Sequence, residues 1–205
     1  MVYNMITQYT EQSLIEFEED IANCFNAAMI KAPVHLYNGN EKQIIDIFHL
    51  IEPDDWIFCT WRSHYQCLLK GVPKEILKKD ILDGKSISLC YPEYKIYSSG
   101  IVGGSIPIAT GMALDIKLKN QNSKVWCFVG DMGSETGTFF ENWKYSVNKN
   151  LPITFVIEDN GKSVCTDTKK TWGSDLYFKN IKDKIIYYEY QTKYPHAGAG
   201  KRIQF

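Results

Sequence analysis

The stretch Lys124-Val125-Trp126-Cys127-Phe128-Val129-Gly130-Asp131-Met132-Gly133 decides the fold, because an apolar run ends here in a polar turn. Residues 124–129 read as a buried strand, and the apolar run Ile153–Ile157 reads as a second one. The segment 138–148 between them has the spacing of a helix packed on a sheet, with Phe139, Trp143 and Val147 at i, i+4 and i+8. This strand, helix, strand order predicts a parallel pair whose carboxyl ends share one edge of the sheet.

Helices and apolar strands alternate along the rest of the chain. We expect helices over 11–30, 41–50, 62–69 and 74–82, a helix marked by Ile106 to Ile116, a short helix over 175–182, and strands over 56–60 and 184–190. Residues 94–99 are too polar and too short for the usual buried strand. The alternation predicts an α/β fold, a mostly parallel sheet with helices on both faces, in a single domain over 1–205.

Polar side chains follow the two strands of the first unit. Asp131 comes after the strand 124–129, and Asn160 comes shortly after the strand 153–157, so both would face one crevice. A carboxylate and an amide oxygen are ligands that Mg²⁺ accepts when substrate phosphates supply others. The alternatives are that Asp131 is only a helix N-cap and that Asn160 is only a turn residue before Gly161. We expect a diphosphate with its metal ion.

Further short motifs are spread along most of the chain. They are Gly130-Asp131 with Gly137, Phe140-Glu141, Lys149-Asn150-Leu151-Pro152 and Glu158-Asp159-Asn160, the segment His35 to Glu41, Trp61-Arg62-Ser63-His64, Gly100-Ile101-Val102-Gly103 before Ile106-Pro107, and Gln191-Thr192 with His196. Together these resemble the alpha subunits of thiamine diphosphate-dependent 2-oxo acid dehydrogenases, of which pyruvate dehydrogenase is the best-known type. The resemblance implies the diphosphate-binding module of a thiamine diphosphate enzyme.

The resemblance also implies roles for individual residues. It implies that Asp131, Asn160 and the backbone carbonyl of Lys162 bind Mg²⁺, and that His64 and His196 lie at the reacting end of the cofactor. The residues expected to contact thiamine diphosphate are Trp61, Arg62, Gly100, Val102, Gly130, Asp131, Met132, Gly133, Asn160 and Lys162. Without the resemblance, Arg62 reads equally well as part of a surface ion pair, the glycine turn as a tight helix entry, and each histidine as a structural residue.

The implied reaction is decarboxylation of a 2-oxo acid with transfer of the acyl group, for which the cofactor supplies the chemistry. In enzymes of this kind a glutamate from a second module activates the cofactor. We find no place for that glutamate here, so we expect a separately encoded beta-type subunit to supply it. The expected assembly is an alpha2beta2 heterotetramer, and the chain alone should be nearly inactive.

Two departures from the family pattern leave other functions open. Met132 replaces the second glycine of Gly-Asp-Gly, and Asp159 replaces the first of two asparagines. One alternative is carbon–carbon ligation or transketolase-like ketol transfer, on a sugar, in a biosynthetic pathway. Another is a scaffold subunit without catalysis, and a third is a dinucleotide-binding oxidoreductase. The turn at 100–105 argues against the third, since its spacing is not G-x-G-x-x-G.

The composition favours no other class of partner. The net charge is −1 with no basic stripe, so we expect no nucleic acid. The longest apolar runs have the length of strands, so we expect no membrane span, and with no apparent signal peptide we expect a cytoplasmic location. The six cysteines lack CxxC spacing and read as reduced structural thiols.

Overall fold

Six strands form the main sheet in the computed structural model, which describes residues 9–197 and 203–205. In spatial order they are β2 (Cys90–Tyr91), β3 (Ile96–Ser98), β1 (Trp56–Cys59), β4 (Val125–Gly130), β5 (Ile153–Asp159) and β8 (Ile185–Glu189). Only the edge pair β2–β3 is antiparallel, and all other neighbours in this sheet are parallel. The predicted mostly parallel sheet is confirmed.

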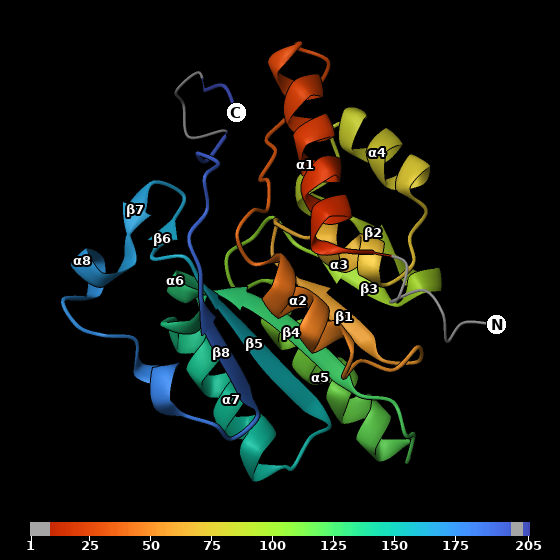
Figure 1. The fold of residues 1–205 in the computed structure, drawn as a ribbon. Coiled ribbons are helices and arrows are strands. Elements are labelled where there is room, and N and C mark those ends of the chain that lie inside the picture. Colours follow the sequence, from red (N-terminus) through yellow and green to blue (C-terminus); the bar gives the residue numbers. More distant parts are fainter. Residues whose placement is uncertain (1–8, 198–202) are drawn as a thin grey trace.

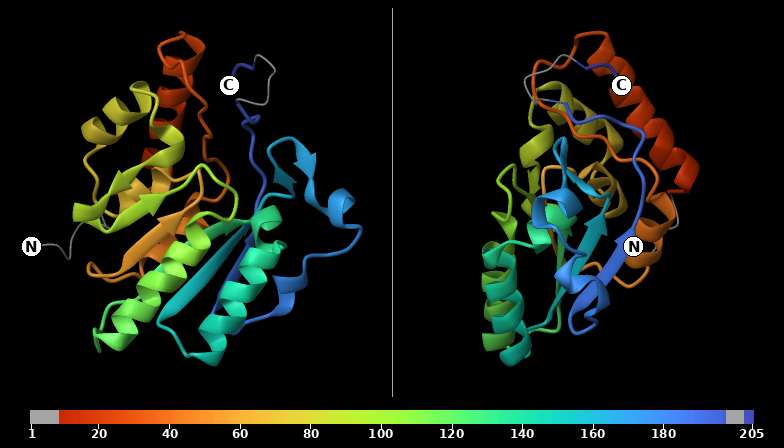
Figure 2. Two further views of the ribbon diagram at one scale, coloured as in Figure 1. Left: turned by 180° about the vertical axis from the view of Figure 1, so that it is seen from behind. Right: turned by 90° about the vertical axis from the view of Figure 1, so that its left-hand side faces the viewer.

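Helices cover both faces of this sheet, as predicted (Figure 1). One face carries α1 (Glu11–Asn26), α2 (Glu41–Phe48), α3 (His64–Leu69) and α4 (Lys74–Leu82). The other face carries α5 (Ser105–Leu118) and α7 (Gly137–Asn148), which lie in front of the strands in the rear view of Figure 2.

Alternation along the strands explains why both faces are covered. In β5, Val156 packs with the apolar residues of α1 to α4, whereas Phe155 and Ile157 pack with those of α5 and α7. Neighbouring β4 repeats the pattern, with Phe128 on the first face and Cys127 on the second. Successive side chains of a strand point to opposite faces, so a strand that is apolar at every position is buried between two helical layers.

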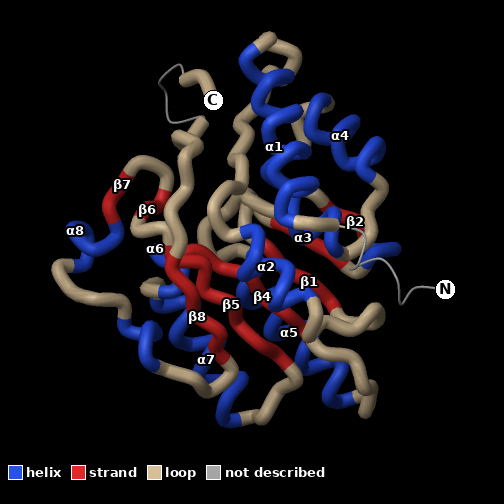
Figure 3. Tube along the Cα trace, viewed as in Figure 1, coloured by secondary structure: helices blue, strands red, loops and turns tan. Residues whose placement is uncertain are grey.

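Several short elements complete the fold. They are α6 (Asp131–Ser134), the hairpin β6 (Lys162–Ser163) and β7 (Thr166–Asp167), α8 (Thr168–Trp172) and the 3₁₀ turns η2 (Ser86–Ser88), η3 (Pro92–Tyr94) and η4 (Tyr177–Asn180). Figure 3 shows that β6, β7 and α8 stand apart from the main sheet, on a long excursion between β5 and β8.

The sequence missed the two strands at one edge of the sheet. Contrary to our prediction for 94–99, β3 is a strand whose residues Ile96 and Ser98 are buried, and it pairs with β1. Because β3 has only three residues and pairs with β2 on one side and β1 on the other, it forms a strand without a long apolar run. The first helix also ends earlier than predicted, since α1 stops at Asn26 and Ala28 adopts a φ of 59°.

The remaining expectations concern thiols, membranes and domains. All six cysteines are free thiols, and only Cys90 and Cys165 are exposed. In the described residues no helix is long and apolar enough to cross a bilayer. The division into a single domain stays a prediction, and residues 1–8 and 198–202 of that domain lie outside the described residues.

Candidate functional site

The strands β1, β4, β5 and β8 all end at the carboxyl-terminal edge of the sheet (Figure 1). A cavity opens at this edge. Because these strands are parallel, the residues that follow them gather at this edge. Most of the predicted site residues line the cavity: Trp61, Arg62, Val102, Gly130, Asp131, Met132, Gly133, Asn160, Lys162 and His196. Gly100 and His64 do not line it.

Asp131 is the first residue of α6, directly after β4, and its side chain is buried. One carboxylate oxygen accepts a hydrogen bond from the hydroxyl of Thr168. Among the described residues, no cationic side chain lies within ion-pair distance of this carboxylate. Burial, with a smaller contribution from the nearby charge of Asp159, raises the pKa of Asp131 to about 6. A bound cation would relieve this burial of negative charge.

Asn160 serves as a turn residue while lining the cavity. Its Oδ1 accepts the backbone N–H of Lys162 at 3.0 Å, and its Nδ2 donates to the hydroxyl of Tyr190 at 3.3 Å. Gly161 adopts a φ of +74° and turns the chain between them. Asn160 therefore shapes the turn, and because one lone pair on Oδ1 is left over, its role as a metal ligand stays a prediction.

The acidic residues do not by themselves make a metal site. No group of three or more His, Cys, Asp or Glu side chains suited to a metal ion occurs in the described part of the chain. A cation at this edge would therefore have mixed ligands, a carboxylate from Asp131, an amide from Asn160 and a carbonyl from Lys162, which together line one cavity. All three are oxygen ligands, the type that Mg²⁺ prefers.

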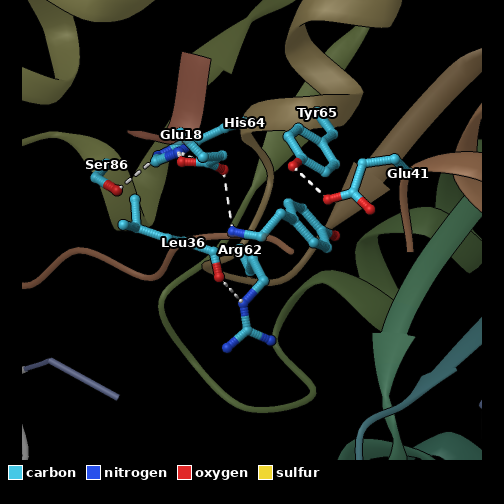
Figure 4. Close-up of polar contacts among 8 residues, drawn as sticks. Glu18, Leu36, Glu41, Arg62, His64, Tyr65 and Ser86 are labelled. Atoms are coloured by element: carbon cyan, nitrogen blue, oxygen red, sulfur yellow. Dashed lines mark hydrogen bonds and ion pairs between the residues drawn. The ribbon is translucent and has the colours of Figure 1, made fainter. Parts of the chain in front are cut away.

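Arg62 presents its charge at the cavity. Its Nε donates to the carbonyl of Leu36 at 3.1 Å, its Nη1 donates to the Tyr190 hydroxyl at 3.3 Å, and the guanidinium lies 5.8 Å from the centre of the Tyr37 ring. Figure 4 shows the hydrogen bond between the Leu36 carbonyl and Nε of Arg62. Within the described residues Arg62 forms no ion pair, so the surface ion-pair alternative is wrong and the fork is available to an anion.

The glycine turn before α5 contributes only its second half. Val102, Gly103 and Ile106 line the cavity, with Val102 49% exposed. Gly100 is exposed outside the cavity, where a Cβ atom would meet the side chain of Ile87 at 3.3 Å. Gly100 does not line the cavity, and its contact with a cofactor stays a prediction.

The turn after β4 is open to a ligand. A Cβ atom at Gly130 or at Gly133 would meet nothing within 4 Å, so the backbone here borders empty space. Met132, which departs from the family pattern, directs its sulfur to Trp172 of α8, whose indole nitrogen lies 3.1 Å away. The thioether therefore contacts the excursion between β5 and β8, and the backbone beside Gly130 stays accessible.

Two histidine rings stack beside the cavity. The centroids of His196 and His35 lie 4.1 Å apart with an interplanar angle of 21°, and His35 also lies 5.8 Å from Trp61. Burial, followed by the nearby charges of His196 and Arg62, lowers the pKa of His35 to about 2. Its buried Nδ1 has no hydrogen-bond partner among the described residues. The sequence did not single out His35, because only the tertiary fold brings it to His196.

This burial predicts a pH-dependent stability difference. His35 binds a proton more weakly in the folded chain than in the unfolded chain, so its contribution to stability is present above pH 6.5 and lost as the pH falls. Urea unfolding of wild type and His35→Gln at pH 7.5, 6.0 and 5.0 should show little relative change above pH 6.5, and below it a loss by the wild type that approaches about 1.4 kcal/mol per pH unit. A difference that stays constant over this range would contradict a neutral, buried His35.

His64 does not line the cavity, and its place at the reacting end of a cofactor stays a prediction. It is fully buried, with Nδ1 3.0 Å from Oε2 of Glu18 and Nε2 2.9 Å from Oγ of Ser86 (Figure 4). Glu18 also accepts the backbone N–H of Tyr37 at 3.1 Å. Glu18 and His64 together fix the segment that contains Leu36, whose carbonyl binds Arg62. His64 therefore supports the site indirectly, through Glu18 and this segment.

The sequence also missed a buried carboxylate in the cavity wall. Glu158 lines the cavity, and its oxygens accept hydrogen bonds from the hydroxyls of Tyr37 at 2.9 Å and Tyr188 at 2.5 Å. Burial raises the pKa of Glu158 to about 7. The apolar pattern of the strand could not reveal these hydrogen bonds, because Tyr37 and Tyr188 lie far from Glu158 in the sequence.

The side chains present fit a metal diphosphate. Asp131 without a cationic partner and Arg62 without an anionic one, both judged within residues 9–197 and 203–205, meet a turn that borders empty space in one cavity. The cation would neutralise Asp131, and the diphosphate would neutralise both the cation and Arg62.

Comparison with known proteins agrees with this arrangement. The model of the family described as Dehydrogenase E1 component matches residues 9–186. The alpha subunit of acetoin:2,6-dichlorophenolindophenol oxidoreductase from Cupriavidus necator is 32% identical over 184 residues, covering 84% of this chain and 55% of the relative. The subunit of the same name from Bacillus subtilis is 31% identical over 161 residues, covering 73% and 48%.

A pyruvate dehydrogenase subunit is similar as well. The pyruvate dehydrogenase E1 component subunit alpha of Rickettsia bellii is 28% identical over 177 residues, covering 81% of this chain and 54% of the relative. The chain thus spans about half the length of the curated relatives it matches. These matches confirm the resemblance predicted from the motifs, and the chain belongs to the Dehydrogenase E1 component family.

Proposed function

We propose that the chain is the diphosphate-binding, alpha-type part of a two-subunit thiamine diphosphate-dependent enzyme that acts on a 2-oxo acid. One observation carries the proposal: the buried carboxylate of Asp131, without a cationic partner among the described residues, lines one cavity with Asn160, Lys162 and Arg62. Membership of the E1 family supports it, as do relatives that are named alpha subunits of acetoin and pyruvate enzymes.

Different cavity residues would bind the metal ion and the diphosphate of the cofactor. Asp131, the free lone pair of Asn160 and the carbonyl of Lys162 would hold Mg²⁺, while Arg62 would bind the diphosphate. The open backbone at Gly130 and Gly133 would let the phosphates approach closely. The backbone of Met132 would border the diphosphate, while its side chain would hold Trp172.

The organic end of the cofactor would lie toward α5 and His196. The apolar side chain of Val102, with Ile106 behind it, would separate the two rings, and Trp61 would line the substrate end. Once bound, thiamine diphosphate supplies the electron sink for decarboxylation. His196 would stabilise the reaction intermediate or donate a proton to it, which would raise the rate by about 10²–10⁴-fold.

The activity would require a second subunit. Relatives that carry the name subunit alpha support a separately encoded beta-type partner, and we propose that this partner supplies the activating glutamate in an alpha2beta2 assembly. The cytoplasmic location stays a prediction.

Reconstitution tests this function. The chain mixed with its beta-type partner, thiamine diphosphate and MgCl₂ should release carbon dioxide from a 2-oxo acid and reduce 2,6-dichlorophenolindophenol, whereas either subunit alone should not. Carbon–carbon ligation or ketol-transfer products without dye reduction would move the reaction to the transketolase-like alternative. Cofactor binding without turnover of any 2-oxo acid or sugar would indicate a scaffold.

A further inference from the structure

Tyr190 joins two parts of the candidate site, although no motif singles it out. It directly follows β8, its side chain is 8% exposed, and it lines the cavity. Its backbone N–H donates to the carbonyl of Asp159 at 2.9 Å, which continues the β5–β8 pairing beyond the last strand residue. The backbone therefore fixes where the ring enters the cavity.

The Tyr190 hydroxyl accepts two hydrogen bonds. It lies 3.3 Å from Nη1 of Arg62 and 3.3 Å from Nδ2 of Asn160. Both nitrogens are donors only, so the hydroxyl oxygen must accept from each. The orientation of the Asn160 amide follows from its other bond, because Oδ1 accepts the backbone N–H of Lys162 at 3.0 Å. The oxygen of Tyr190 is thus shared between the arginine and the asparagine.

The hydroxyl proton of Tyr190 remains to be donated. A tyrosine hydroxyl has one proton to give, and no acceptor for it is found among the described residues. Arg62 and Asn160 occupy the acceptor side of the oxygen, so the proton is left for an acceptor outside the described residues. Tyr190 lines the cavity, where such a ligand would lie. An oxygen of a bound ligand is the acceptor that this geometry suits.

We propose that Tyr190 is a further ligand-binding and positioning residue, which holds Arg62 and Asn160 together and donates its hydroxyl proton to the diphosphate. The inference rests on the proposed thiamine diphosphate site and adds a residue to it. Because one hydroxyl contacts both the diphosphate-binding arginine and the metal-binding asparagine, its removal should weaken binding of diphosphate and Mg²⁺ together.

The test is calorimetric titration of Tyr190→Phe, which keeps the ring and removes only the hydroxyl. We expect thiamine diphosphate at saturating MgCl₂, and Mg²⁺ at saturating thiamine diphosphate, each to bind about tenfold more weakly than to the wild type, the size expected for one hydrogen bond to a charged group. Inorganic pyrophosphate with MgCl₂ should show the same loss. The ligand-free melting temperature should fall by only a few degrees, because two donors lose a shared acceptor while the ring stays packed.

Tyr187→Phe is the matched control. Tyr187 lies on β8, three residues before Tyr190, but its hydroxyl binds Asp159 and Glu189 and it does not line the cavity. This control should bind every probe as the wild type does. Wild-type affinities in Tyr190→Phe, or an equal loss in Tyr187→Phe, would overturn the inference and leave the proposed function standing. Failure of the wild type itself to bind thiamine diphosphate would overturn both.

Discussion

Asp131→Ala is expected to lose magnesium-dependent binding of thiamine diphosphate, with an affinity at least about 100-fold below that of the wild type. Loss of a residue that only supports a metal ligand already costs about 10–100-fold, so loss of the charged ligand itself should cost no less. Asp131 is also buried without a cation among the described residues, which leaves the metal as its natural partner. Calorimetry with and without MgCl₂ measures the effect.

Two further variants separate this role from a structural one. Asp131→Asn keeps the shape of the side chain and an acceptor for Thr168, so it should lose metal binding while its free energy of unfolding at pH 7 stays the same or rises. Asp175→Ala removes an exposed carboxylate that pairs with Lys169, and it should bind the cofactor as the wild type does. Tight, magnesium-dependent binding by Asp131→Asn would contradict the ligand role.

Glu18→Ala is expected to produce the largest loss of stability, about 3 kcal/mol or more in the free energy of unfolding. The buried Glu18 carboxylate accepts hydrogen bonds from the Tyr37 backbone and lies 3.0 Å from Nδ1 of His64 (Figure 4). Each buried group left without a partner costs about 1–3 kcal/mol, and the cavity adds to this. Denaturant unfolding measures the change.

Glu16→Ala provides the control on the same helix. Glu16 is exposed, and its one hydrogen-bond partner in the described part of the chain is Gln12, so its loss should change the free energy of unfolding by less than about 0.5 kcal/mol. Equal effects of the two variants would show that the buried network adds nothing. Where Glu18→Ala still folds, weaker binding of thiamine diphosphate is also expected, because the Leu36 carbonyl that orients Arg62 lies beside Tyr37.

The layer order of this fold was predictable because its central strands carry long apolar runs, Val125–Val129 in β4 and Phe155–Ile157 in β5. The strands β4 and β5, and helix α7 between them, begin and end within two residues of the predicted bounds. The sheet then dictates that Asp131 and Asn160 follow neighbouring parallel strands, which brings both to one cavity. Local patterns suffice for this part of the site.

The rest of the site depends on contacts between distant segments. His64 has the spacing of a site residue, yet α3 turns it inward to Glu18. Conversely, Tyr190 lies at the end of a strand with no motif of its own, and its importance arises from Arg62, which is distant in sequence. Edge strand β3 was missed for a related reason, since its pairing with β1 compensates for its short length.

The central claim is that this chain binds thiamine diphosphate through a magnesium ion at the end of β4 and β5. Calorimetric titration of thiamine diphosphate into the chain, with MgCl₂ or with EDTA, alone and with the beta-type partner, tests it most directly. The account predicts binding that requires Mg²⁺, strengthens with the partner and vanishes in Asp131→Ala. Absence of binding under every condition, or binding of equal strength in EDTA, would contradict it.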